Sequence, residues 1–189
     1  DVRQDAWYYW DVVRVYENGL MVGTGADEFS PTVPVTRGML VTVLHRLAGE
    51  PAAAAGGSFS DVLESAWYAR AIAWAKESGI VNGVGGNLFA PGDSVTREQA
   101  AVILLNYANH MDLTMRNAQI SQLDFADAAQ ISDWALEGAA YCYSNGIIGG
   151  KPNKLFDPQC QATRAEIAAI LNRFVETADS GAEKSAQQQ

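Results

Sequence analysis

The sequence carries one residue pattern three times, and this repetition limits the possible folds more than any other feature. Each copy has a Trp, a Gly twelve residues later, a second Gly four residues on, and then a Phe, a Pro and a Thr-Arg pair at matching distances. In chain order, the copies (repeats 1, 2 and 3) place these residues at Trp7, Trp67 and Trp134; Gly19, Gly79 and Gly146; Gly23, Gly83 and Gly150; Phe29, Phe89 and Phe156; Pro31, Pro91 and Pro158; and Arg37, Arg97 and Arg164. Copies offset by 60 and 67 residues indicate one supersecondary unit used three times. Function is therefore expected in what all three copies share.

Composition and charge narrow the class of protein. A unit of about 60 residues builds only a small core, so we expect the repeats to bury apolar faces against one another. Hydrophobic residues make up 48% of the chain, which excludes disorder for most of it. The net charge of -9, without clusters of Lys and Arg, excludes nucleic acid as a partner. No apolar run is long enough to predict membrane insertion, and a start without Met or signal peptide predicts a piece of a longer protein.

Each repeat is predicted to fold as a helix, a Gly-rich loop and a second helix. Side chains able to cap the first helix stand two positions before each Trp, at Asp5, Ser65 and Ser132. The first helix is predicted to end at an Asn-Gly or Ser-Gly pair, because Gly adopts the left-handed conformation of a helix C-terminus without steric cost. These pairs are Asn18-Gly19, Ser78-Gly79 and Asn145-Gly146.

The second helix shows the clearer hydrophobic periodicity. Apolar residues recur at i, i+3, i+4 and i+7 in every copy, which predicts one buried helix face. They are Leu40, Val43, Leu44 and Leu47; Ala100, Ile103, Leu104 and Tyr107; and Ile167, Ile170, Leu171 and Phe174. The predicted N-caps are Thr36, Thr96 and Thr163. Gln99 and Glu166 complete a capping box in repeats 2 and 3, whereas repeat 1 has Met39 there and lacks the reciprocal bond.

The same register predicts the boundaries of the repeats. Repeat 1 covers residues 1–50 and begins without the Phe that precedes the corresponding Asp in the other copies. The remaining segments are a linker at 51–58, repeat 2 at 59–109, a linker at 110–123, repeat 3 at 124–176 and a flexible polar tail at 177–189. Because each repeat is predicted to consist of two helices, we predict an all-α fold. No unit covers its apolar faces alone, so the repeats should pack against one another. The three helix-loop-helix repeats are expected to pack as a pseudo-threefold, three-pronged helical cluster within one monomer.

Catalytic and metal-binding signatures are weak. Cys142 and Cys160 have no neighbouring His that would complete a zinc site, and they could form a disulfide or remain two small thiols. His45 and His110 fall at unrelated positions of the repeat, which argues against a histidine-based catalytic site. We therefore expect no cofactor, no metal and no enzymatic activity.

The combined pattern resembles the S-layer homology (SLH) domain. Repeat 2 carries it most fully, from Phe59-Ser-Asp61 through the Trp and the Gly loop to Phe89-Ala-Pro91 and Thr96-Arg97-Glu-Gln99. Repeat 3 keeps Asn145-Gly-Ile-Ile-Gly-Gly150 and Thr163-Arg-Ala-Glu166. Three matches in one register cover about residues 1 to 176.

The resemblance implies a function as well as a fold. Such modules hold bacterial surface proteins non-covalently to the cell wall, which implies an extracellular place at the cell surface. Their ligand is a peptidoglycan-linked secondary cell wall polysaccharide whose terminal N-acetylmannosamine carries a pyruvate ketal, and it is bound in grooves between repeats. The implied ligand-binding residues are Arg37, Arg97 and Arg164; Asp1, Asp61 and Asp127; Trp7, Trp67 and Trp134; and Gly23, Gly83 and Gly150.

The chemistry of these residue types agrees with an acidic sugar. Arg at the start of a helix offers a forked, permanently charged donor to a carboxylate, and a Trp face can cover the apolar face of a pyranose. Each set also has a structural explanation. The Arg residues could form ion pairs between helices, the Asp residues could cap a helix, the Trp residues could pack in a core, and the Gly residues are turn formers first.

Two other functions stay open from the sequence. A protein-interaction or structural spacer module of a bacterial surface protein would use the same cluster without a sugar. A wall-active glycoside hydrolase would need two carboxylates facing each other across a cleft, and the recurring acidic residues coincide instead with capping positions.

Overall fold

The computed structural model describes residues 1–53, 59–113 and 118–186. Within these ranges the regular elements are helices joined by loops and isolated β-bridges, which confirms the all-α prediction. The α-helices are α1 (Tyr9–Glu17), α2 (Arg37–Leu47), α3 (Ala69–Glu77), α4 (Arg97–His110), α5 (Leu136–Ser144) and α6 (Arg164–Ala186). The 3₁₀ helices are η1 (Ile120–Gln122), η2 (Ala128–Gln130), η3 (Asp133–Ala135) and η4 (Pro152–Lys154).

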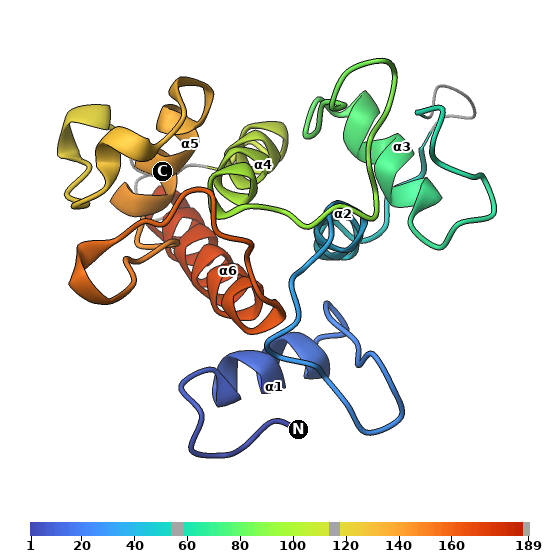
Figure 1. The fold of residues 1–189 in the computed structure, drawn as a ribbon, viewed down its shortest axis with the longest axis horizontal. Coiled ribbons are helices and arrows are strands. Elements are labelled where there is room, and N and C mark those ends of the chain that lie inside the picture. Colours follow the sequence, from blue (N-terminus) through green and yellow to red (C-terminus); the bar gives the residue numbers. More distant parts are fainter. Residues whose placement is uncertain (54–58, 114–117, 187–189) are drawn as a thin grey trace.

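The helices form three lobes around a centre (Figure 1). The second helices of the repeats, α2, α4 and α6, lie at the centre, and α1, α3 and α5 lie in the lobes. The first helix of each repeat packs on the second helix of the repeat before it: α3 on α2, α5 on α4, and α1 on α6. The last pairing closes the chain on itself. Every repeat therefore completes its hydrophobic core with a neighbour, as expected for units too small to stand alone.

A ring of backbone hydrogen bonds joins the three repeats just before their second helices. The N–H of Val35 donates to the carbonyl of Ala162 at 2.8 Å, Ala162 donates to Val95 at 3.0 Å, and Val95 donates back to Val35 at 2.9 Å. All three residues are fully buried. Because each bond leads to a different repeat and the third returns to the first, the ring is closed and pseudo-threefold.

The second helices begin as the sequence predicts. The side chains of Thr36, Thr96 and Thr163 accept the N–H three residues on, and the boxes with Gln99 and Glu166 are complete. The first two N–H groups of each second helix donate to loop carbonyls of the next repeat, as for Arg37 to Asp93 at 2.9 Å and Gly38 to Pro91 at 3.0 Å. These donors would otherwise lack partners. They are therefore not free to bind an anion.

The first helices begin later than predicted. Helix α1 starts at Tyr9 and α3 at Ala69, after a turn that contains the Trp, and the capping roles of Asp5, Ser65 and Ser132 were wrong. Ser132 hydrogen-bonds the buried carboxylate of Glu98 in the preceding repeat instead. The C-terminal prediction is confirmed, since the helices end before Gly residues with φ of 67°, 68° and 68°.

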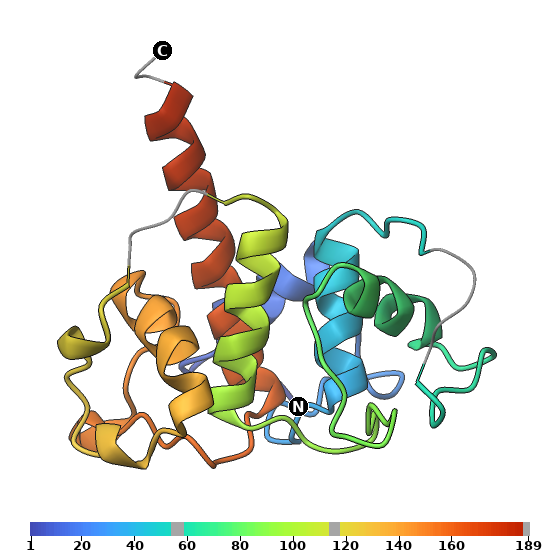
Figure 2. The ribbon, with the colours of Figure 1, turned by 90° about the horizontal axis from the view of Figure 1, so that it is seen from above.

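Helix α6 runs further than expected. It continues to Ala186 and projects beyond the cluster (Figure 2). Residues 177–186 of the predicted flexible tail at 177–189 are thus helical, and their flexibility stays a prediction. The remaining three residues lie outside the described ranges. The segment contains no Pro and several good helix formers, and the packed turns before it supply the nucleus that an isolated short helix lacks. In the described part of the chain, no helix combines the length and apolar character needed to cross a membrane.

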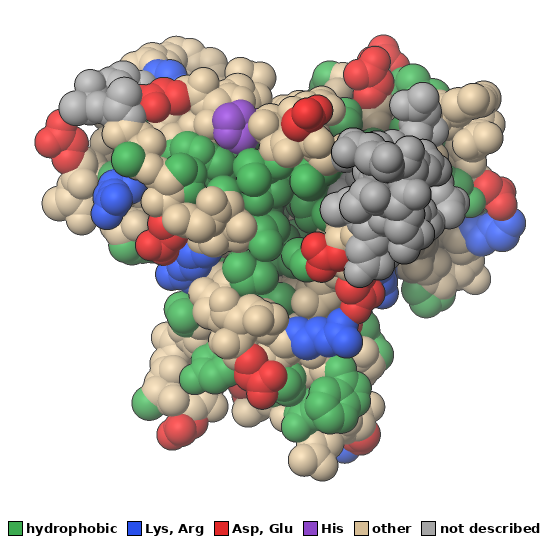
Figure 3. All heavy atoms as spheres, turned by 180° about the vertical axis from the view of Figure 1, so that it is seen from behind, with side chains coloured by type: hydrophobic (Ala, Val, Ile, Leu, Met, Phe, Trp, Pro, Cys, Tyr) green, Lys and Arg blue, Asp and Glu red, His purple; other side chains and the backbone are tan. Residues whose placement is uncertain are grey.

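Hydrophobic side chains gather where the three lobes meet, while charged side chains lie mostly on the lobes (Figure 3). Within the lobes of repeats 2 and 3, Phe59 and Phe125 pack against Phe89 and Phe156 with ring centroids 5.3 and 5.2 Å apart. Repeat 1 has a cavity of about 340 Å³ bordered by Asp1, Val2 and Phe29 among others. By the register of the repeat, this cavity lies where Phe59 and Phe125 place their phenyl rings in repeats 2 and 3.

We predict that this cavity accepts an aromatic ring. Adding Phe-Ser ahead of Asp1, as in Phe59-Ser60, is expected to raise the melting temperature by a few degrees. Burial of a phenyl group contributes roughly 1.5–3 kcal/mol, and each kcal/mol shifts the transition of a chain this size by about 2–4 °C. Thermal denaturation against an Ala-Ser extension isolates the ring, and equal melting temperatures would contradict the prediction.

Candidate functional site

The three Arg side chains of the repeated pattern reach across to the next repeat. They are buried, with 7%, 4% and 5% of their surface exposed for Arg37, Arg97 and Arg164. The Nε of Arg37 donates to the carbonyl of Phe89 at 2.8 Å and its Nη2 to that of Asn82 at 3.1 Å. The guanidinium carbon lies 4.6 Å from the centre of the Phe89 ring. Repeat 1 is thus attached to the loop of repeat 2.

The same arrangement recurs around the molecule. Arg97 Nε and Nη2 donate to Phe156 and Gly149 at 2.7 and 3.2 Å. Arg164 Nε and Nη2 donate to Phe29 and Val22 at 2.7 and 2.6 Å, and this closes the ring from repeat 3 to repeat 1. The acceptors are backbone carbonyls rather than the carboxylates of an ion pair between helices. Two of the three guanidinium nitrogens are therefore used without neutralising the charge.

The third nitrogen distinguishes Arg97 from the other two Arg residues. Nη1 of Arg97 donates to the carboxylate of Glu166 at 3.3 Å. In the described part of the chain, Nη1 of Arg37 and Nη1 of Arg164 make no hydrogen bond. Neither atom is fully buried, because the fully buried polar side-chain atom without a partner in that part of the chain is Ser144 Oγ. Those two Nη1 atoms therefore keep access to solvent, at the groove surfaces described next.

Two grooves lie between repeats and are related by the repeat register. Groove 1 has a volume of about 450 Å³ and groove 2 about 230 Å³. Each is formed by the Gly loop and second helix of one repeat, the Arg of the preceding repeat and the Trp of the following one. Groove 1 is lined by Met21, Val22, Gly23, Thr24, Val35, Met39, Thr42, Val43, Arg46, Trp67 and Arg164. Groove 2 is lined by Ile80, Val81, Asn82, Gly83, Val84, Gln99, Val102, Ile103, Asn106, Trp134 and Arg37.

The third inter-repeat position, groove 3, follows from the same register. Its Arg is Arg97, its loop contains Gly149 and Gly150, and its Trp is Trp7. Lys151 takes the place of Thr24 and Val84, and donates to Asp157 Oδ2 at 2.8 Å. Its Nζ also lies 3.6 Å from Glu166 Oε1. In groove 3, two cations, Arg97 and Lys151, therefore already face carboxylates, and Arg173 stands at the position of Arg46.

The recurring Trp side chains are exposed, so the core-packing explanation for them was wrong. Trp7, Trp67 and Trp134 keep 66%, 62% and 58% of their surface accessible. The helix begins only two residues after Trp7 and Trp67, and each indole stands at the edge of the turn against the following Tyr, with centroids 5.3 and 5.0 Å apart. The indoles of Trp67 and Trp134 line grooves 1 and 2.

The recurring Asp side chains hold the loop of their own repeat. Asp61 Oδ1 and Oδ2 accept the N–H groups of Phe89 and Ala90 at 2.8 and 2.7 Å. Asp1 and Asp127 accept the equivalent pairs of N–H groups in repeats 1 and 3. Asp127 makes no capping bond to the helix η2 that follows it. These carboxylates therefore fix the loop whose carbonyls receive the Arg side chains.

The second Gly of each loop is needed for close packing. A Cβ on Gly23 would lie 2.7 Å from the Glu28 carbonyl oxygen, and one on Gly83 would lie 2.4 Å from the Leu88 oxygen. A Cβ on Gly150 would lie 3.2 Å from the ring of Phe125. Gly23 and Gly83 also line grooves 1 and 2, so the same residues close the loop and shape the site.

Burial makes the two unpaired guanidinium groups good partners for an anion. Loss of hydration on burial lowers the pKa of Arg164 below its ordinary value. Burial also lowers the pKa of Arg37, and the carboxylates of Asp93 and Asp61 offset part of this effect. A buried charge without a counter-charge is costly, and a carboxylate in the groove would supply one. The site can therefore bind an acidic group beside an aromatic face.

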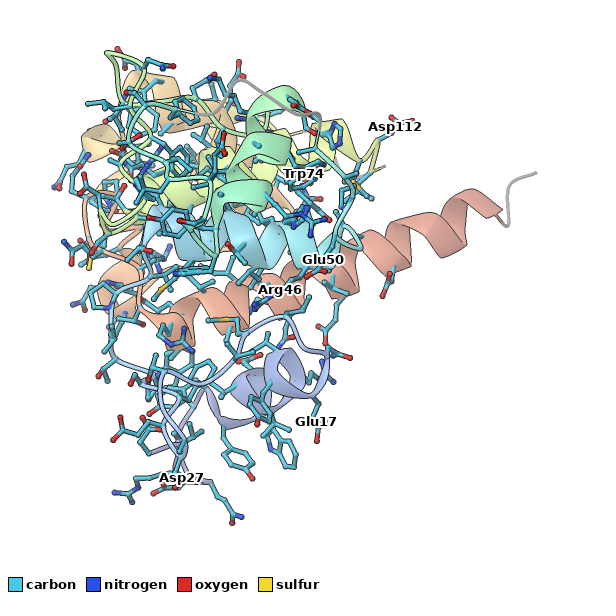
Figure 4. The ribbon with its side chains drawn as sticks, turned by 90° about the vertical axis from the view of Figure 1, so that its right-hand side faces the viewer. Glu17, Asp27, Arg46, Glu50, Trp74 and Asp112 are labelled. Atoms are coloured by element: carbon cyan, nitrogen blue, oxygen red, sulfur yellow. The ribbon has the colours of Figure 1, made fainter. Side chains whose placement is uncertain are left out.

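Sequence reasoning missed the groove-facing side of the second helix. Arg46 and Asn106 occupy one register position and line grooves 1 and 2. Arg46 lies on the side of α2 that faces the loop of repeat 1, where its Nη1 donates to the Leu20 carbonyl at 3.0 Å (Figure 4). A signal was present, since position 46 and its equivalents are polar in all repeats. Cys142 and Cys160 are both free thiols, so the disulfide alternative is excluded.

We predict that Arg164→Ala destabilises the fold. The change removes two hydrogen bonds to carbonyls and the stacking on Phe29, and it should cost roughly 2–4 kcal/mol. Chemical denaturation would measure the free energy of unfolding, with Arg70→Ala as the control because Arg70 is exposed on α3. Equal stability of the two variants would show that the inter-repeat bonds contribute little.

We also predict that Asp61 makes stability depend on acid pH. Desolvation raises the pKa of Asp61, but the N–H groups of Phe89, Ala90 and Asp61 and the charge of Arg37 lower it, and the result lies below the ordinary 3.8. A depressed folded-state pKa stabilises the fold above the ordinary value, and this contribution is lost as the pH falls through the folded-state pKa. Asp61→Asn should lower the melting temperature by a few degrees at pH 7, and the difference from the unmodified chain should shrink below about pH 4. A constant difference from pH 7 to pH 3 would contradict this role.

Comparison with known proteins agrees with this architecture. The S-layer homology domain family matches residues 1–38, 58–101 and 124–168. Amylopullulanase from Thermoanaerobacterium thermosulfurigenes is 36% identical over 167 residues, which cover 88% of this chain and 9% of that protein. Exoglucanase XynX from Acetivibrio thermocellus is 36% identical over 171 residues, or 90% of this chain and 16% of that protein. A cellulosome-anchoring protein from Acetivibrio thermocellus is 26% identical over 156 residues, or 78% of this chain and 33% of that protein.

The chain therefore spans a third or less of the length of each of these relatives. The three matched segments together cover more than half of it, and each coincides with one of the repeats that the hydrogen-bonded ring joins. The chain belongs to the S-layer homology domain family.

Proposed function

We propose that this chain is a non-catalytic module that holds its host protein to the bacterial cell wall from outside the cell. Its ligand is a peptidoglycan-linked secondary cell wall polysaccharide that ends in pyruvylated N-acetylmannosamine, bound in the grooves between repeats. The boundaries of the three repeats, at 1–50, 59–109 and 124–176, are part of the same proposal. The proposal includes neither insertion into a membrane nor binding to nucleic acid.

One observation carries the proposal. Grooves 1 and 2 each combine an exposed indole with a buried guanidinium that has one nitrogen without a protein partner, and the three repeats contribute these groups in the same order. This nitrogen is open to solvent, so it can donate to a ligand in the groove without breaking a bond within the protein. An exposed Trp on each lobe has no role in the core.

The groups suit the parts of an acidic sugar. Nη1 of Arg37 or Arg164 can donate to the pyruvate carboxylate, while the other two nitrogens, held by loop carbonyls, keep the guanidinium in place. The indole of Trp67 or Trp134 can cover the apolar face of the pyranose ring. The Asp carboxylates act by positioning the loop. The net charge of -9 opposes a polyanion at long range, so binding must come from these local contacts and weaken with salt.

The relatives support attachment rather than catalysis. One of them is a cellulosome-anchoring protein, and the two named as enzymes share with this chain only a small part of their length. The recurring acidic residues at positions 1, 61 and 127 each accept two backbone N–H groups. Carboxylates held in this way are poorly placed to act as the acid and nucleophile of a glycosidase.

Co-sedimentation with purified cell walls tests the proposal. We predict that the chain pellets with intact walls and stays in solution when the secondary polymer has been chemically stripped. Trp67→Ala combined with Trp134→Ala should weaken binding about fivefold at each groove, because a stacked aromatic contributes on the order of 1 kcal/mol at each site. Stability should not change, since both indoles are exposed.

Trp10→Ala is the matched control. Trp10 is 73% exposed but stands outside the repeated pattern, so its removal should leave pelleting unchanged. Equal pelleting with stripped walls, or equal loss in the Trp10 variant, would contradict the proposal. Binding of a wall protein without any binding of the polymer would favour the interaction-module alternative.

A further inference from the structure

The three grooves share one plan but differ at the third position of the second helix. Met39, Gln99 and Glu166 occupy this position in repeats 1, 2 and 3. The residue stands beside the guanidinium that enters from the preceding repeat: Met39 with Arg164 in groove 1, Gln99 with Arg37 in groove 2, and Glu166 with Arg97 in groove 3. What stands here therefore decides whether the last guanidinium nitrogen is free.

Glu166 uses both of its oxygens within the protein. Oε2 accepts the Thr163 N–H at 2.8 Å and the Thr163 hydroxyl at 3.1 Å, which fixes the carboxylate at the helix N-terminus. Oε1 is thereby held 3.3 Å from Nη1 of Arg97. The Glu166 side chain is 16% exposed, so solvent screens this ion pair weakly. All three nitrogens of Arg97 are consequently occupied.

Gln99 and Met39 cannot do the same. Gln99 Oε1 accepts the Thr96 N–H at 3.1 Å, so the only oxygen of its amide is held at the helix N-terminus, and the other end of the amide is an NH₂ group, which cannot accept from Arg37. Met39 has only a thioether, a weak acceptor without charge. The guanidinium nitrogens Nη1 of Arg37 and Arg164 thus remain available in grooves 2 and 1.

The other charged residues in grooves 1 and 2 indicate which of the two should bind an anion more tightly. Groove 1 is the larger and adds Arg46 to Arg164, whereas groove 2 has neutral Asn106 at the position of Arg46. Asp93 and Asp61 also lie close enough to Arg37 to offset part of its charge. Groove 3 has two additional cations: Lys151, which is hydrogen-bonded to Asp157, and Arg173 at the position of Arg46, so its closure rests on the pairing of Arg97 with Glu166.

We infer that Glu166 closes groove 3 to the acidic ligand, and that grooves 1 and 2 bind it, groove 1 more tightly. This inference rests on the proposed function, because it says which sites of the wall-binding module are used. It assigns position 39 and its equivalents as the residue that determines specificity for an anion. The groove built on the loop and second helix of the repeat with the most complete Thr-Arg-x-Glu pattern is then the one that does not bind, while Arg164 of that repeat serves groove 1.

Two reciprocal substitutions test it without disturbing the fold. Met39→Glu places in groove 1 the residue that closes groove 3, and it also completes the missing capping box, so it should not lower stability. Glu166→Gln places in groove 3 the residue found in groove 2 and keeps its capping box. Thr32→Glu is the matched control, because it adds the same charge to repeat 1 at an exposed position outside the lining of groove 1.

Each groove contains one Trp, which makes occupancy measurable site by site. The indole N–H resonances of Trp67, Trp134 and Trp7 would be followed by NMR during titration with the methyl glycoside of pyruvylated N-acetylmannosamine. The same glycoside without pyruvate is the uncharged control. In the unmodified chain, Trp67 should respond at the lowest concentration, Trp134 next, and Trp7 least, with two binding sites by calorimetry.

The variants should shift this pattern in opposite directions. Met39→Glu should weaken the Trp67 response at least about tenfold and leave one calorimetric site, because an internal carboxylate competes with the ligand for Nη1. Glu166→Gln should produce a Trp7 response and a third calorimetric site, and Thr32→Glu should leave the Trp67 response unchanged.

The outcomes separate this inference from the function on which it rests. A Trp7 response equal to that of Trp67 in the unmodified chain, or an unchanged Trp67 response in Met39→Glu, would overturn the role of position 39 while wall binding stands. No indole response together with normal pelleting on walls would overturn both the inference and the pyruvylated ligand. No pelleting on intact walls would overturn the anchoring function itself.

Discussion

A buried guanidinium that crosses from one repeat to the next is the interaction on which this structure depends. It links the loop, the second helix and the neighbouring unit, and it does so through backbone carbonyls. Carbonyl acceptors satisfy the donors without cancelling the charge, so each link leaves positive charge inside a groove. A protein carboxylate in place of the carbonyl acceptors would also have held the repeats together, but it would have neutralised the positive charge that attracts an anion.

The contacts that each repeat makes with its neighbours around the ring explain why the three repeats occur together. Each first helix packs on the second helix of the preceding repeat, and the first two N–H groups of each second helix are satisfied by the loop of the next. A single repeat would expose both an apolar helix face and unpaired helix donors. Because every groove takes residues from three repeats, the binding surface exists only once the ring is closed.

Local chemistry was predictable from the sequence, and long-range placement was not. The 3.6-residue periodicity, the Thr caps and the Gly helix ends each depend on neighbours within a few positions, and they were located correctly. The turn that delays α1 and α3 and turns Trp67 outward has no comparable local signature. The direction in which the Arg37 side chain points could not be predicted from the sequence either, because its hydrogen-bond partners, the carbonyls of Asn82 and Phe89, belong to another copy of the same pattern.

At the third position of the second helix, the residue that completes the repeated pattern is not the residue that favours ligand binding. Glu at the third position of the second helix gives the better helix cap, since its charge also complements the helix dipole. The same carboxylate then lies within reach of the incoming Arg, as Glu166 does with Arg97. Met39 gives up the reciprocal cap and leaves Arg164 with a free nitrogen. A repeat that departs from the pattern can therefore be the better ligand site, with stability supplied by the other two.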